Sequence, residues 1–454
     1  MKLFPSFTNG ILAGVITACC AFQANAAADD TLSAARDMQL AIVKGSAIEK
    51  VLGQSSDDYS VMVFNGTELA PIPFQFDDLN DKGFPYVPGG SLAIEGQEGI
   101  IEAQDELVFM IRDSGSKAEA DALAAVEGEV VLELELKDLN IQRYAYLVKG
   151  NASRSDVHYT HYNQETGFIK TDHFTLETDP DNIFVWADLM YEGYEPQKSI
   201  WDTMKIRIHA RMGFLKTTLS NRFIPSEVVA VKNGAVRTII SVDATIALFG
   251  VELASAGANV TVTSQTLQFP VHITVPKAAN ILSDFNIDIS LDFHEMDGVQ
   301  IRSGAGSKEP LVAGKDGIGA GAEPKDLALS VEESWLTGTT QQGWDIIAFF
   351  VGSKNFAPDL DVLYFDHGRD SEEDSPERYD GSYPQVGYIV NELPVGEAIV
   401  IGIDLYFDDG FWADGNLETS VKELQNPIAV IAHTPDGIAS TGLASNGLAS
   451  SVSE

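Results

Sequence analysis

The sequence predicts an all-β protein, built from one or more antiparallel β-sandwich domains with few short helices. Short runs alternate apolar and polar side chains, as in Val130–Leu136 and Ile239–Ile246, which is typical of half-buried strands. Turn signals such as Asn65-Gly66 separate these runs at intervals of roughly 8–12 residues. Helical periodicity is confined to three short stretches, Thr31–Asp37, Ala118–Val126 and Asn416–Leu424.

The expected strands follow one another without the helical crossovers that a parallel sheet requires. They are Tyr59–Phe64, Val130–Leu136, Tyr144–Val148, Lys205–Met212, Val228–Val231, Ile239–Ile246, Val260–Thr263, Phe269–Val275 and Ile399–Leu405. The spacing of turns along this series favours a sandwich over a βαβ sheet.

Composition divides the chain into six regions. They are a signal peptide at 1–26, an N-terminal β domain at 27–150, a central β domain with a basic strand at 151–302, a glycine-rich loop at 303–324, a C-terminal β region at 325–433 and a disordered tail at 434–454. The tail is rich in Ala, Ser and Gly, which predicts disorder.

The first residues predict export to the periplasm or the cell exterior. An apolar stretch follows Lys2, and Ala24-Asn25-Ala26 has the small-x-small pattern of a signal peptidase site. The alternative is a lipid anchor at Cys19, because Ile16-Thr17-Ala18-Cys19 is similar to a lipoprotein cleavage site. Both cysteines lie in this segment, so cleavage after Ala26 leaves no thiol in the mature chain. No later run is apolar enough over roughly 18 residues to predict a membrane helix.

The charge balance excludes some classes of protein. Asp and Glu number 67 against 29 Lys and Arg, a formal net charge of -38. Such acidity disfavours binding of nucleic acid over the whole surface, because phosphates would be repelled. A hydrophobic content of 44% provides enough apolar matter for a core, which excludes a disordered acidic chain.

An acidic segment between residues 71 and 115 predicts a Ca²⁺ site. Asp78-x-Asn80-x-Lys82-Gly83 partly follows the calcium-loop pattern, in which oxygen ligands on alternate residues converge on one ion. Lys82 interrupts the pattern, so the segment is no EF-hand. The candidate ligands are Asp77, Asp78, Asn80, Asp105 and Glu106. The alternative is that these side chains cap turns and accept backbone N–H groups.

The same segment resembles a recurring pattern in uncharacterised exported bacterial proteins. The residues that support the resemblance are Gln75-Phe76-Asp77-Asp78, Asp105-Glu106-Leu107-Val108-Phe109-Met110 and Asp113-x-Gly115. They cover about a tenth of the chain. The resemblance implies a β-rich domain and no activity.

A basic region interrupts the acidic chain. Residues 198–237 contain eight Lys and Arg side chains against Asp202 and Glu227. Within this region, strict alternation predicts a strand that places Lys205, Arg207, His209 and Arg211 on one face. Like charges on one face require negative partners. Two alternatives follow: a lattice with acidic residues of neighbouring strands, or an anion-binding face.

No complete catalytic motif is present: the sequence has no Walker loop and no G-x-S-x-G elbow. The preferred hypothesis is therefore an exported non-catalytic β-sandwich that binds a carbohydrate or an envelope component, with a structural Ca²⁺. One alternative is a lyase or hydrolase of acidic glycans that uses the basic strand. Another is an interaction subunit of an envelope complex.

Overall fold

The structure is a computed structural model, and it confirms the predicted fold class. It describes residues 31–80, 82–195, 198–248, 251–274, 277, 283–294, 296, 298–314, 326–330, 332–353, 359–365, 382–391, 393–394 and 396–435. In this part of the chain the sheets are antiparallel and the α-helices are few and short. The predicted signal peptide, Cys19, residues 315–324 of the glycine-rich loop and most of the predicted tail lie outside the described residues.

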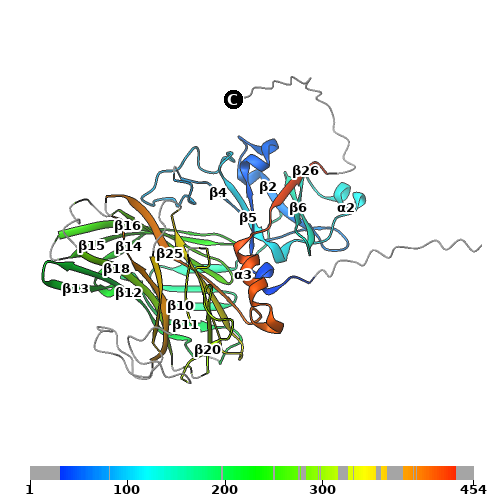
Figure 1. The fold of residues 1–454 in the computed structure, drawn as a ribbon. Helices are drawn as coiled ribbons and strands as arrows, with labels where there is room; N and C mark the ends of the chain where they lie inside the picture. The colour runs from blue at the N-terminus through cyan, green and yellow to red at the C-terminus, as the bar shows by residue number, and fades with distance from the viewer. Residues whose placement is uncertain are drawn as a thin grey trace, which may run out of the picture.

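Two sheets near the N-terminus form what we call the small module, seen at the upper right in Figure 1. One sheet has the order β1-β5-β4, with β1 Leu40–Lys44, β5 Glu106–Met110 and β4 Gln75–Asp77. The other has the order β26-β6-β7-β2-β3, with β26 Val430–His433, β6 Glu129–Lys137, β7 Gln142–Lys149, β2 Tyr59–Phe64 and β3 Leu69–Pro71. Side chains from both sheets, among them Phe109, Leu134 and Tyr59, share one core.

The small module contains a strand from the far end of the chain. β26 pairs antiparallel with β6, placing Val430 opposite Leu136 and His433 opposite Glu133. Ile428, just before β26, is buried in the core of the module. Residues 31–149 therefore complete their sheet with a segment that lies in the predicted C-terminal region.

Most of the remaining strands form the large sandwich. Its smaller sheet has the order β13-β12-β18-β24-β23, with β13 Leu215–Ser220, β12 Trp201–Met212, β18 Ser283–His294, β24 Ser382–Asn391 and β23 Asp359–Phe365. Its larger sheet has the order β14-β15-β16-β17-β25-β22-β21-β19-β20. These strands are β14 Ser226–Asn233, β15 Thr238–Leu248, β16 Val251–Val262, β17 Thr266–Thr274, β25 Ala398–Asp408, β22 Asp345–Gly352, β21 Trp335–Thr339, β19 Gln300–Ser303 and β20 Leu311–Val312. Strands from the predicted central and C-terminal regions pair in both sheets, so these regions share one architecture. β20 lies inside the predicted glycine-rich loop.

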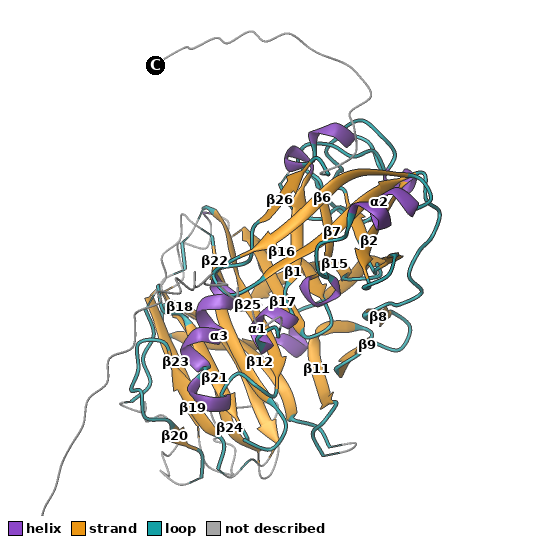
Figure 2. Cartoon of the chain, turned by 90° about the vertical axis from the view of Figure 1, so that its right-hand side faces the viewer, coloured by secondary structure: helices purple, strands orange, loops and turns teal. Residues whose placement is uncertain are grey.

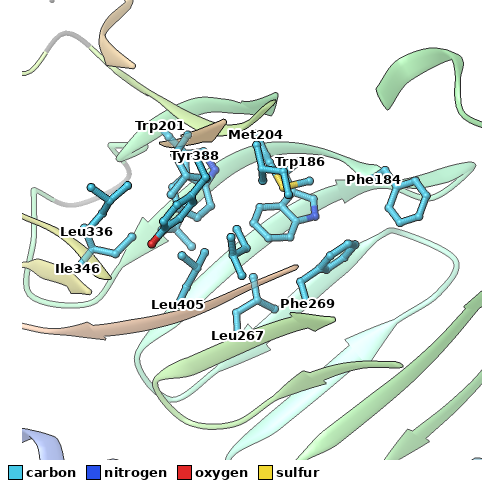
Figure 3. Close-up of a cluster of buried hydrophobic side chains, with 14 of the residues drawn as sticks. Phe184, Trp186, Trp201, Met204, Leu267, Phe269, Leu336, Ile346, Tyr388 and Leu405 are labelled. Carbon is cyan, nitrogen blue, oxygen red and sulfur yellow. The ribbon is translucent and has the colours of Figure 1, made fainter. Parts of the chain in front are cut away.

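The core of the large sandwich is dominated by aromatic and branched side chains (Figure 3). Trp186 and Trp201 stack with ring centroids 5.9 Å apart, and Phe269 meets Trp186 edge-on at 5.5 Å. Trp186 belongs to a four-stranded sheet, β11-β10-β9-β8, with β11 Asn182–Tyr191, β10 Phe174–Asp179, β9 Phe168–Thr171 and β8 Thr160–Asn163. Full burial of each such ring is worth about 1.5–3 kcal/mol, so this cluster holds three sheets together.

Two helices cover part of the outer face of the larger sheet (Figure 2). α1, Ala34–Asp37, and α3, Leu417–Gln425, pack apolar side chains on β21, β22 and β25, where Trp335, Ile347 and Tyr406 face outward. Arg36 donates to the carbonyls of Glu423 and Asn426 at the end of α3, a favourable place for a cation. These helices and α2, Ala120–Ala125, lie where the sequence predicts them. None of the described helices is long and apolar enough to cross a membrane.

Candidate functional site

The outer face of the larger sheet is hollowed beyond the part that α1 and α3 cover. A groove of about 640 Å³ lies over β14, β15, β16 and β17. Alternate residues of these strands face the sandwich core, for example Val242, Ala258 and Ile273. The intervening residues form the floor of the groove, and most are small and polar: Glu227, Ser241, Asp243, Thr245, Ser255, Gly257, Asn259, His272 and Thr274.

One row of this floor crosses four strands in register. Glu227 of β14 pairs with Asp243 of β15, Asp243 pairs with Gly257 of β16, and Gly257 pairs with His272 of β17. A Cβ atom added at Gly257 would meet its nearest neighbour at 3.6 Å, an ordinary contact distance. Gly257 therefore leaves open space between a carboxylate and an imidazole that project from strands two apart.

The wall of the groove comes from the small module. Lys82, Ser91 and Leu92 line it, and all three belong to the loop of residues 78–105 between β4 and β5. Ser91 donates a hydrogen bond of 2.7 Å to Asp243. The ring of Phe84 packs edge-on against His272, with centroids 4.4 Å apart. The loop therefore lies over the floor, as Figure 1 shows above β16.

His272 is the imidazole of the groove, and its surroundings favour the neutral form. Burial, and then the nearby ammonium of Lys82, lower its pKa. Within the described residues its buried Nε2 atom has no hydrogen-bond partner. A neutral imidazole offers one donor and one acceptor, so His272 places an unpaired, buried polar position at the edge of the groove.

Three of the predicted calcium ligands shape this loop through backbone contacts. Asp78 accepts from the N–H of Gly99, and Asn80 accepts from those of Lys82 and Phe84. Asp105 accepts from the N–H groups of Leu79 and Glu102. Burial raises the pKa of Asp105 to about 6 despite these bonds. These contacts are those expected if the three side chains cap turns, the alternative to a Ca²⁺ site.

The other two predicted ligands, Asp77 and Glu106, bind cationic side chains. Asp77 lies 2.7 Å from both Arg237 Nε and Lys232 Nζ, and Glu106 lies 2.6 Å from Arg237 Nη2. Burial opposes ionisation of both carboxyls, but Arg237 in each case, with Lys232 at Asp77 and Lys44 at Glu106, outweighs it and keeps both pKa values low.

These ion pairs have a structural consequence and bear on the predicted metal site. Arg237 and Lys232 come from the hairpin of β14 and β15, so the ion pairs fix the base of the loop to the floor of the groove.

In the described part of the chain, no three His, Cys, Asp or Glu side chains are placed together to hold a metal ion. The calcium site stays a prediction.

The basic strand forms as predicted and pairs with acidic residues of β18. In β12, Ile208 and Ala210 face the core. On the opposite face, Lys205 Nζ lies 2.5 Å from Asp292, His209 Nε2 lies 2.9 Å from Asp288, and Arg211 Nε lies 2.6 Å from Asp284. These contacts form the first of the two arrangements considered for the basic strand, a lattice with acidic residues of a neighbouring strand.

The four basic side chains of this face differ in exposure. Lys205 is fully buried and Arg207 is 5% exposed, with hydrogen bonds to Ser220 and Asn221. His209 and Arg211 are about one-third exposed. All four side chains already contact carboxylates or polar groups of the protein, and an anion-binding role for them stays a prediction.

A second polar cluster contains the residue types of a catalytic triad without its geometry. Ser264 Oγ lies 2.6 Å from Asp172 and 3.0 Å from His173 Nδ1, and that same nitrogen lies 3.2 Å from Asp172. A triad places the serine and the carboxylate on opposite ring nitrogens. Arg112 of the small module lies 2.7 Å from Asp172. The cluster therefore joins the module to the turn between β16 and β17.

The sequence prediction missed the floor of the groove. Asp243, Gly257 and His272 were not candidate residues, because each lies in a strand with no recognisable motif. A signal was present: Ser241, Asp243 and Thr245 alternate with core residues in β15, as do Ser255, Gly257 and Asn259 in β16. Small polar residues on the outer face of several strands indicate a surface that is not part of the apolar core.

Fold and site together define an antiparallel β-sandwich protein with a polar groove on its larger sheet.

No family model and no curated protein matches the chain. Among solved structures, it is similar to an α-mannosidase from Enterococcus faecalis V583, with 10% identity, a TM-score of 0.47, and coverage of 88% of this chain and 45% of the other. It is also similar to the α-N-acetylgalactosaminidase NagBb from Bifidobacterium bifidum, with 9% identity, a TM-score of 0.36 and coverage of 57% and 38%. A putative aldose 1-epimerase from Escherichia coli K12 matches with 10% identity, a TM-score of 0.31 and coverage of 52% and 96%. The chain thus spans less than half of the first two proteins, and we draw no function from these matches.

Proposed function

We propose that the protein is a carbohydrate-binding β-sandwich and that its binding site is the groove over β14–β17. The observation on which the proposal rests is the row Asp243–Gly257–His272, in which two polar groups flank an open position on a concave sheet. The hydrogen-bonding groups around this row are numerous and mostly uncharged, which suits a ligand that presents many hydroxyl groups.

The chemistry of the floor supports a sugar as the ligand. Each hydroxyl of a sugar both donates and accepts, and Ser, Thr, Asn and neutral His side chains offer both kinds of group. Ser255, Asn259 and Thr274 surround the central row. A volume of about 640 Å³ lies within the range of roughly 300–1,000 Å³ that is usual for small-molecule sites.

The alternative of an enzyme that uses the basic strand has less support. Neutralising a uronate carboxylate would require free cations on that face. Lys205 and Arg211 instead lie within ion-pair distance of Asp292 and Asp284. A new ligand would have to displace these carboxylates, at a cost that is large for the buried pair.

The substitution Gly257→Leu tests the proposal. The added Cβ meets no protein atom closer than ordinary contact distance, so we expect the side chain to occupy the groove without displacing the strand. We expect a saccharide that binds the unmodified protein, identified by screening a glycan panel, to lose at least about 1.4 kcal/mol of binding free energy, or tenfold in Kd. Isothermal titration calorimetry measures this change.

Thr218→Leu is the matched control, because Thr218 is an exposed strand residue on the outer face of the other sheet. It should leave the Kd unchanged. Unfolding curves of both variants establish that they fold. Equal affinity of Gly257→Leu and the unmodified protein would place the binding site elsewhere, and release of cleaved or unsaturated products from the bound glycan would identify an enzyme instead.

A further inference from the structure

The groove contains two carboxylates on directly paired residues. Glu227 of β14 and Asp243 of β15 are register partners, and both line the groove. Side chains in such a position have Cβ atoms about 4.5–5.5 Å apart, and like charges there destabilise the sheet. Both residues are exposed to the groove, so the protein keeps a concentrated negative charge at one end of the row.

The described part of the chain does not neutralise this pair. Asp243 accepts a hydrogen bond from Ser91, which is uncharged. Neither carboxylate forms an ion pair with a described residue, although Lys205, His209 and Arg211 on the other sheet each have such a partner. Lys82 lines the same groove, where it acts on His272. We therefore expect the ligand to supply the positive charge that neutralises the two carboxylates.

We propose that the carbohydrate bound in the groove carries a free amino group, and that Glu227 and Asp243 bind its ammonium. This inference rests on the proposed function. The ammonium lies at the β14–β15 end of the row, the sugar ring lies over Gly257, and a hydroxyl group reaches His272 on β17. Hydrogen bonds from an ammonium to carboxylates are about twice as strong as those between neutral groups, so the amine determines specificity.

The arrangement predicts an order of binding affinity among ligands. An amino sugar binds best, its N-acetylated form binds more weakly because it has no charge, and a uronate binds worst because the two carboxylates repel it. Added salt weakens the binding of the amino sugar most, since screening acts on charges near the surface. This ranking is the reverse of the one expected for the basic strand.

Calorimetric titration of the full chain tests the inference. The probes are glucosamine oligosaccharides, the same oligosaccharides fully N-acetylated, and a uronate oligomer of equal length, at a pH at which the amine is protonated. We expect the amino form to bind about tenfold more tightly than the acetylated form, and Glu227→Gln to abolish this difference. Glu165→Gln, an exposed acid in the turn between β8 and β9, is the control and should preserve it.

Three outcomes would overturn the inference. If amino and acetylated forms bind equally and Gly257→Leu weakens both, the groove binds sugars without selecting an amine, and the proposed function stands alone. If none of the saccharides binds, both the inference and the proposed function fail. If Ca²⁺ alone binds the protein and Glu227→Gln removes that binding without any preference among sugars, the pair belongs to a metal site.

Discussion

Two carboxyl groups with similarly raised pKa values have different hydrogen-bond partners, and this difference predicts opposite effects of the same substitution. Burial raises the pKa of both Asp105 and Asp404 to about 6. An acid whose folded-state pKa is raised costs stability as the pH rises from about 4, where it ionises in the unfolded chain, to about 6. Asp404 accepts a bond of 3.1 Å from the side chain of Gln268, which the carbonyl of an asparagine can also accept.

Asp404→Asn should therefore raise the urea midpoint of unfolding at pH 7.5 and leave it nearly unchanged at pH 4. Asp105→Asn should lower the midpoint at both pH values, because one of the two backbone N–H groups that Asp105 accepts would then face an NH₂ group. A loss of stability in Asp404→Asn at pH 7.5 that equals the loss in Asp105→Asn would contradict this account.

The ion pairs of Arg237 give a second prediction at the scale of single residues. Arg237→Met leaves Asp77, which is fully buried, with Lys232 alone and removes a partner of Glu106. Breaking a buried pair by removing one partner costs about 3–5 kcal/mol, and we expect a loss of this size at pH 7. Because the pKa values of both carboxyls are lowered, their stabilisation is complete above about pH 4 and is lost as the pH falls further.

Denaturant unfolding at pH 7 and near pH 3 measures the effect of Arg237→Met, which should shrink at the lower pH. Lys44→Met is the matched control. Lys44 also pairs with Glu106, but its side chain is 48% exposed, so its removal should cost no more than about 1 kcal/mol. Equal losses for the two variants would show that burial does not decide the strength of these pairs.

At the scale of elements, the pairing of β12 with β18 combines a buried ion pair with an exposed one. Lys205 and Asp292 are 0% and 2% exposed, whereas Arg211 and Asp284 are 36% and 60% exposed. We expect Lys205→Met to lower the free energy of unfolding by about 3–5 kcal/mol and Arg211→Ala by less than about 1 kcal/mol. Chemical unfolding at pH 7 measures both, and a larger effect of Arg211→Ala would contradict the ranking.

The same pair of strands shows what the sequence could predict and what it could not. Alternation in Lys205–Met212 was enough to place Lys205 and Arg211 on one face, as the structure has them. Their partners on β18 are about 80 residues away, and no local pattern sets that pairing. β16 was only partly predicted, because Ala254-Ser255-Ala256-Gly257-Ala258 has low strand propensity by composition. Its extended form depends on hydrogen bonds to β15 and β17.

At the scale of the whole molecule, contacts between distant segments determine where the candidate site lies. Asp77 and Arg237 are 160 residues apart, so no local pattern in the sequence could pair them. The acidic residues alone led to the prediction of a Ca²⁺ site. In the fold, Arg237 and Lys232 lie beside Asp77, and these ion pairs join the small module to the floor of the groove. A surface built from two modules in this way is not visible in either segment alone.

The return of the C-terminal segment to the small module gives the last prediction. Truncation after Gln425 keeps α3 but removes Ile428 from the core of the module and β26 from the edge of β6. We expect the small module to unfold at a lower temperature than the large sandwich, because lost burial of such a side chain costs about 2–5 kcal/mol and β6 becomes an exposed edge. Calorimetry should resolve a second, earlier transition, and limited proteolysis should cleave within residues 31–149. The chain truncated after Pro435, which retains β26, should melt as the full chain does.

The 78–105 loop forms the wall of the groove. The chain truncated after Gln425 should therefore also bind saccharide less tightly at temperatures between the two transitions. Unchanged melting and unchanged binding would mean that β26 is dispensable to the module.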